Sequence, residues 1–155
     1  MNKLLGLLLT AALTATTMVP QAGVAQDPKH ELEALMERME LLVEAIYEED
    51  YVIAHIEVDK LYEGQQYSFT RVLLEENNYK VIGVGGWGIK DLDVRIEDSA
   101  GEVIDEDTTD DNVPIVNANV PSSQRYTIRT LAYELEEGVE ESEYFFIVVV
   151  AFQKN

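Results

Sequence analysis

The sequence predicts a mainly β protein: an antiparallel, jelly-roll-like β-sandwich of about eight strands, preceded by one amphipathic α-helix. Three observations lead to this fold class. Apolar residues recur at helical spacing up to about Glu49 and then alternate with a period of two. Turn residues separate the alternating segments at short intervals, and no second helical pattern interrupts them.

Residues 1–25 have the features of a secretory signal peptide. Lys3 supplies a positive charge, residues 4–13 form a short apolar run, and small residues precede the end of the segment at Ala25. The apolar run is too short to span about 30 Å of hydrocarbon. We therefore expect cleavage after Ala25, no stable membrane insertion of the mature chain, and export to the periplasm or the extracellular medium.

Residues 26–50 are predicted to form the amphipathic helix. Asp27 is suited to accept free N–H groups at the N-cap, and Pro28 is suited to the first helical position. The apolar stripe consists of Leu32, Leu35, Met36, Met39, Leu42, Val43 and Ile46, and glutamates occupy the opposite face. Such a stripe either packs on its own domain, which we favour, or binds a partner protein.

Residues 51–155 are predicted to form the β-sandwich domain. Clean alternation in residues 91–97 places Leu92, Val94 and Ile96 in the core. The nearly continuous apolar run 145–151 predicts a central strand, and Asn77-Asn78 is one of the predicted turns. The predicted strands are 51–61, 65–74, 79–85, 92–97, 103–107, 113–120, 124–133 and 144–152.

Composition excludes several classes of function. The chain has 155 residues, 30 acidic against 11 basic side chains, a formal net charge of −19 and no cysteine. The length supports one ordinary domain, and so negative a field repels phosphates, which argues against a nucleic-acid partner. The lack of cysteine excludes disulfides, thiol catalysis and cysteine-bound metals.

The residues offer little for covalent catalysis. The two histidines, His30 and His55, are not accompanied by a serine-nucleophile motif, and one tryptophan is a poor basis for a sugar-cleaving groove.

Residues 83–88 match a dinucleotide-binding loop by letter, but a strand follows where that loop needs a helix. We interpret them as a flexible loop whose glycines allow positive φ, and we expect no enzyme.

Acidic clusters are the feature with the most chemical content. Asp91 and Asp93 lie two residues apart on one predicted strand, and Asp105 and Asp107 end the next. In a hairpin, the start of the first strand lies beside the end of the second, so we expect these carboxylates to meet. Such oxygen ligands suit Ca²⁺, and the four residues form a candidate calcium site. The alternative is a solvated face that protects a sheet edge.

Several segments resemble the pre-peptidase C-terminal-type domain of secreted bacterial proteins. Residues 91–104 are similar to its DLDlxlxDxxGxxv segment, residues 107–116 to its DxxxDxxPxV continuation, and residues 121–129 and 144–149 to two later strands. The similarity covers about residues 64–152. It implies a jelly-roll-like, non-catalytic sandwich, usually appended to an enzyme. Some relatives bind calcium, and some bind polymers. Here only a helix precedes the sandwich.

These observations lead us to expect an exported, non-catalytic binding or accessory module, stabilised by calcium if the acidic site forms, with an unknown protein or polymer as its partner. A structural or interaction protein that pairs through its N-terminal helix is the alternative from another class. An unrecognised hydrolase is the least favoured reading.

Overall fold

The computed structural model describes residues 28–137 and 143–154, so the predicted signal peptide lies outside the described residues. Their strands form two four-stranded antiparallel sheets: sheet A with the order β1-β8-β3-β6 and sheet B with the order β2-β7-β4-β5. This is the strand order of a jelly roll, and the predicted fold class is confirmed. The elements are α2 (Pro28–Glu48), β1 (Val52–Leu61), β2 (Gln66–Leu73), β3 (Asn77–Gly85), β4 (Ile89–Glu97), β5 (Val103–Asp107), β6 (Ile115–Asn119), β7 (Gln124–Leu135) and β8 (Tyr144–Lys154).

Alternate strand residues build the core between the two sheets. Leu92, Val94 and Ile96 of β4 are buried there, as the alternation predicts. Strand β8 lies between β1 and β3, which confirms the predicted central strand. It is buried on both faces, because one set of its side chains enters this core and the other set faces α2.

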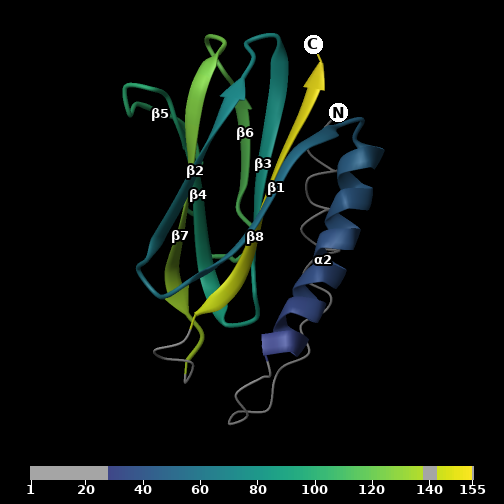
Figure 1. Ribbon diagram of the computed structural model, residues 1–155, viewed down its shortest axis with the longest axis vertical. Coiled ribbons are helices and arrows are strands. Elements are labelled where there is room, and N and C mark those ends of the chain that lie inside the picture. The colour runs from purple at the N-terminus through teal and green to yellow at the C-terminus, as the bar shows by residue number, and fades with distance from the viewer. Residues whose placement is uncertain (1–27, 138–142, 155) are drawn as a thin grey trace.

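Helix α2 packs its apolar stripe on the outer face of sheet A, so the molecule has three layers (Figure 1). The buried stripe residues Leu35, Leu42 and Ile46 contact a patch formed by Ile82, Val84, Ile147 and Val149. The stripe therefore packs on its own domain, as we favoured from the sequence.

Two charged side chains of α2, the half-buried Arg38 and the buried Glu31, bind the sandwich. The Arg38 guanidinium donates to the Gly85 carbonyl at 2.5 Å and to Asn112 Oδ1 at 3.2 Å. Near the start of the helix, Glu31 Oε1 accepts the Phe145 N–H at 2.8 Å. Burial lowers the pKa of Arg38; it raises that of Glu31, although the Phe145 hydrogen bond opposes the rise. These hydrogen bonds therefore fix the orientation of α2 on sheet A, in addition to its apolar contacts.

The glycines of residues 83–88 serve close packing. A Cβ on Gly86 would lie 2.7 Å from both Glu31 Oε1 and the Phe145 carbonyl, and one on Gly88 would lie 2.2 Å from the Tyr144 ring. None of the glycines in this run has a positive φ; among the described glycines that conformation occurs at Gly64 and Gly101. The interpretation of residues 83–88 as a loop whose glycines make use of positive φ is therefore wrong, and residues 83–85 belong to β3.

The strand ends differ from the prediction by at most three residues, and one turn is misplaced. Residues 74–76 form the turn, while Asn77 and Asn78 already belong to β3. Asn77 is buried, and its Nδ2 donates to the Tyr79 hydroxyl at 3.2 Å. A side-chain hydrogen bond inside the sheet thus explains an asparagine that turn statistics assign to a loop.

Candidate functional site

Strands β4 and β5 pair as the predicted hairpin, but their register divides the candidate calcium ligands between two faces. Asp105 and Asp107 pair with Ile96 and Val94, which point into the core. Cross-strand partners share a face, so these two aspartates turn toward the inter-sheet side. Asp93 occupies an intervening position of β4 and leaves the outer face of sheet B, whereas Asp91 lies at a register shift and is buried.

Asp107 accepts three hydrogen bonds from the segment that follows it. Its Oδ1 accepts the Thr109 hydroxyl at 2.7 Å and the Thr109 N–H at 3.1 Å, and its Oδ2 accepts the Ile115 N–H at 2.8 Å. The carboxylate therefore orders the connection between β5 and β6. Within residues 28–137 and 143–154, no three acidic or histidine side chains are grouped so as to hold a metal ion.

Asp91 and Asp93 nevertheless share a strongly acidic environment. Burial, followed by the charges of Asp91, Asp107 and Glu106, raises the pKa of Asp93 to about 6. Burial likewise raises the pKa of Asp91, which is only 4% exposed and whose Oδ1 has no hydrogen-bond partner. Ionisation of these two carboxyl groups therefore lowers the stability of the folded protein.

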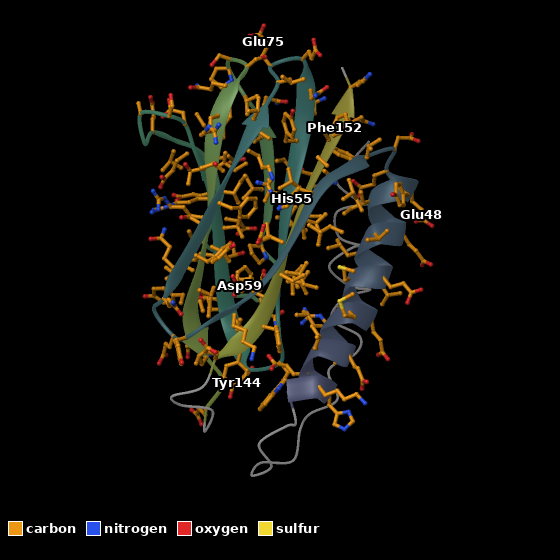
Figure 2. All side chains as sticks on the ribbon, in the orientation of Figure 1. Glu48, His55, Asp59, Glu75, Tyr144 and Phe152 are labelled. Atoms are coloured by element: carbon orange, nitrogen blue, oxygen red, sulfur yellow. The ribbon has the colours of Figure 1, made fainter. Side chains whose placement is uncertain are left out.

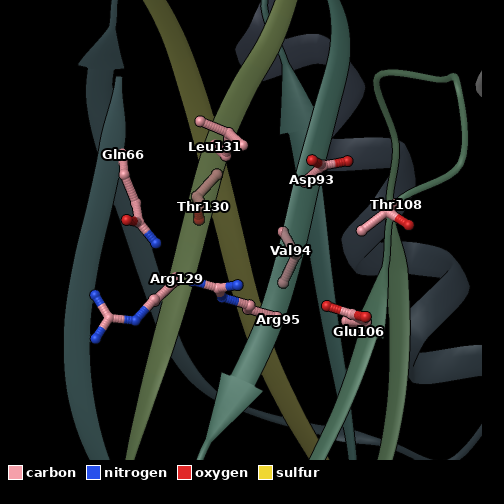
Figure 3. A pocket seen from close by; sticks show the side chains of 9 residues that line it. All are labelled: Gln66, Asp93, Val94, Arg95, Glu106, Thr108, Arg129, Thr130 and Leu131. Atoms are coloured by element: carbon pink, nitrogen blue, oxygen red, sulfur yellow. The ribbon is translucent and has the colours of Figure 1, made fainter. Parts of the chain in front are cut away.

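Asp93 also lines a hollow on the outer face of sheet B (Figure 3). The hollow measures about 120 Å³ and crosses β2, β7, β4 and β5. The lining includes the cationic donors Arg95 and Arg129 and the anionic acceptors Asp93 and Glu106. Val94 and Leu131 add apolar surface. The lining residues are Gln66, Asp93, Val94, Arg95, Glu106, Thr108, Arg129, Thr130 and Leu131.

One carboxylate organises the basic side of this hollow. Arg95 and Arg129 are cross-strand partners, and both place their Nε on the buried carboxylate of Glu97, at 2.9 and 2.6 Å. Glu97 is thereby compensated by two guanidiniums that would otherwise repel each other. Since each guanidinium has five N–H donors, the contact through Nε leaves further donors at the surface.

A second polar cluster lies between the sheets where β1 and β2 form the sandwich edge. Glu57 accepts hydrogen bonds from His55 Nε2 at 2.8 Å and from the Tyr67 hydroxyl at 2.9 Å, while Arg71 Nη2 lies 2.9 Å from His55 Nδ1. Arg71 Nη2 also lies 2.5 Å from His55 Nε2, so the guanidinium contacts both ring nitrogens of the imidazole. Phe69 packs beside both the imidazole and the guanidinium.

Two side chains of this cluster, Glu57 and Tyr67, have pKa values shifted away from neutrality. Burial by itself would raise the pKa of Glu57, but the hydrogen bonds from His55 and Tyr67 and the charge of Arg71 outweigh it and lower that pKa. Burial and the bond to Glu57 raise the pKa of Tyr67 to about 12. Neither group exchanges protons readily near neutral pH. The partners of His55 given by the hydrogen bonds are Glu57 and Arg71, and neither is a nucleophile.

Sequence reasoning did not find either polar cluster. Arg95, Glu97 and Arg129 are separated in sequence and meet only across the sheet register. The spacing of His55, Glu57 and Asp59 on one strand was a usable signal, because period two places all three on one face.

No protein-family model and no curated protein matches the chain. Among residues 28–137 and 143–154, we find no helix with the length and apolar character needed to cross a bilayer.

Proposed function

We propose that the protein is an exported, non-catalytic binding module and that the uncovered outer face of sheet B is its recognition surface. The observation that supports this most is the difference between the two outer faces. Helix α2 packs on that of sheet A, whereas sheet B leaves polar side chains and the hollow beside Arg95 open to solvent (Figures 1 and 3).

The size and chemistry of the hollow favour a hydroxyl-rich polymer as ligand. A volume of about 120 Å³ is smaller than the ~300–1,000 Å³ of sites that enclose a small molecule, so it would hold one corner of a larger ligand. Hydroxyl groups both donate and accept, and therefore match Arg95 and Arg129 on one side and Asp93 and Glu106 on the other. Tyr133 lies on β7, the strand of Arg129, and its ring is 63% exposed. The ring adds an apolar contact surface.

The other functions considered have less support. The helix stripe is already buried on sheet A, so pairing with another chain through that stripe would require α2 to leave its own domain. A hydrolase that used His55 would need a nucleophile beside it, and the hydrogen bonds of this ring run to Glu57 and Arg71.

Depletion from solution by insoluble polysaccharides tests the proposal. The protein should be retained on at least one of microcrystalline cellulose, chitin and starch granules. Arg95→Ala should reduce that retention at least tenfold, while the matched charge removal Lys29→Ala, on the exposed surface of α2, should not. Failure to bind all three polymers, or equal retention of Arg95→Ala and the wild type, would refute it.

A further inference from the structure

Strand β1 presents an open backbone edge. It ends sheet A and pairs with β8, and from His55 to Leu61 the pairing is regular. The Lys60 N–H is bound by the Asp59 side chain at 2.8 Å, so it points away from β8. Backbone groups of successive strand residues point alternately to the two sides. Ile56 and Val58 therefore direct their N–H and C=O groups to the same open edge as Lys60.

The side chains at these positions form half of an apolar strip. Ile56 and Val58 pair with residues of β8 that face α2, yet they remain 37% and 42% exposed. This is the reverse of the usual arrangement, because their polar neighbours His55 and Glu57 point between the sheets. A strand that turns apolar side chains outward beside an open edge is a candidate contact surface.

Helix α2 carries further apolar side chains on the flank that faces β1. Successive helical residues are rotated by about 100°. Arg38, which reaches Gly85 at the end of β3, therefore lies on one flank of the buried stripe, and Met36 and Met39 lie on the opposite flank, toward β1. Met36 is 41% exposed. We call Met36, Met39, Ile56 and Val58 the β1 strip.

The surroundings of the β1 strip are acidic. Asp59 is exposed next to Val58, and exposed glutamates follow Met36 and Met39 along α2 at Glu37 and Glu40, so carboxylates outnumber the basic Lys60 here. Glu57 is already bound by His55 and Tyr67. Figure 2 labels Asp59 on β1 in front of the sandwich. A second copy of this chain would bring like charges to this edge, whereas a basic segment would neutralise them.

We propose that the open edge of β1 accepts an extended segment of a partner protein in which apolar and basic residues alternate. The segment pairs with the open-edge backbone groups of Ile56 and Val58 as an added strand. Its apolar side chains cover the β1 strip, and its basic side chains face the exposed Asp59. This site is separate from the outer face of sheet B, so it does not depend on the polymer-binding role.

A synthetic peptide of seven residues that alternates lysine and valine tests the proposal. Titration calorimetry should detect binding, and hydrogen exchange should show protection of the Ile56 and Val58 amides. A peptide with the same composition but N-methylated at alternate residues, so that one backbone edge cannot pair, should bind at least tenfold more weakly. The protein is unaltered in this comparison, so its folding does not enter.

Matched variants separate the strip from general charge attraction. The double variant Ile56→Thr, Val58→Thr keeps the charge and β propensity and should weaken binding at least tenfold. Val72→Thr, at an exposed position on β2, should not. The proposal is overturned by equal binding of the two peptides, by protection elsewhere, or by no binding at millimolar peptide. Protection that grows with protein concentration in the absence of peptide would assign the edge to a second copy instead.

Discussion

Replacement of Asp93 by asparagine is expected to stabilise the protein at neutral pH. Asp93 lies on the outer face of sheet B, and burial together with the charges of Asp91, Asp107 and Glu106 raises its pKa from the ordinary value of 3.8 to about 6. The folded state therefore opposes ionisation of this carboxyl group. Asparagine keeps the shape and removes the charge.

The magnitude follows from the pKa of Asp93. A rise from 3.8 to about 6, at about 1.4 kcal/mol per pKa unit, corresponds to at most about 3 kcal/mol. Asp93 is only half-buried, so solvent screening reduces this, and we expect about 1.5 kcal/mol. For a domain of this length that is an increase in Tm of about 5 °C.

The sign of the pH dependence is determined by the same shift. Because the folded pKa of Asp93 is raised, the folded state retains a proton that the unfolded state loses between about pH 4 and pH 6. The cost to the wild type is absent below about pH 4 and complete above about pH 7. The advantage of Asp93→Asn should therefore vanish near the acidic limit and grow on going to neutral pH.

Thermal and urea unfolding at several pH values measure this. Glu75→Gln removes one charge from an exposed turn and serves as the control for the general effect of net charge. If Asp93→Asn stabilises equally at both ends of the pH range, or destabilises at neutral pH, then the side chain does not occupy the environment described.

Three further outcomes are expected. Leu42→Ala should lower the free energy of unfolding by about 3 kcal/mol, because it leaves a cavity between α2 and sheet A; a change below about 1 kcal/mol in urea unfolding would mean that the helix is not docked there. Gly88→Ala should lower Tm by several degrees, because the added Cβ meets the Tyr144 ring. Ala100→Gly in the exposed turn should change Tm little. A Tm of Gly88→Ala equal to that of the wild type would exclude the close contact. Millimolar Ca²⁺ should leave Tm nearly unchanged, since Asp93 and Asp107 leave opposite faces; a rise that Asp93→Ala abolishes would instead support the calcium site predicted from the sequence.

The acidic hairpin shows how far sequence reasoning reached for the site. The pairing of β4 with β5 was predictable, because a turn signal separates two alternating segments. The face of each aspartate was not, because it depends on the register. A β-bulge near Glu97 shifts the pairing, and a change of one residue moves a side chain to the other face. The hollow beside Arg95 likewise depends on the register between β4 and β7, which pairs Arg95 with Arg129.

Strand β1 shows the limit for the core. Hydropathy alone would turn Ile56 and Val58 inward. The structure turns His55 and Glu57 inward instead, where Tyr67 and Arg71 of β2 satisfy them. A β-bulge between Ile53 and His55 sets this orientation. The side chains that bind His55 and Glu57 in this inward orientation belong to β2 of the other sheet. The sequence around β1 therefore does not predict it.

The amino-acid pattern by itself determined the helix, the succession of strands, the central position of the last strand and the residues that face the core on β4, since these depend on periodicity within a few neighbouring residues. Tertiary structure decided which outer face α2 covers, which carboxylates meet, and which edge and face remain open. Those features arise from register, bulges and contacts between residues far apart in the chain, and they are the ones on which both proposed binding surfaces depend.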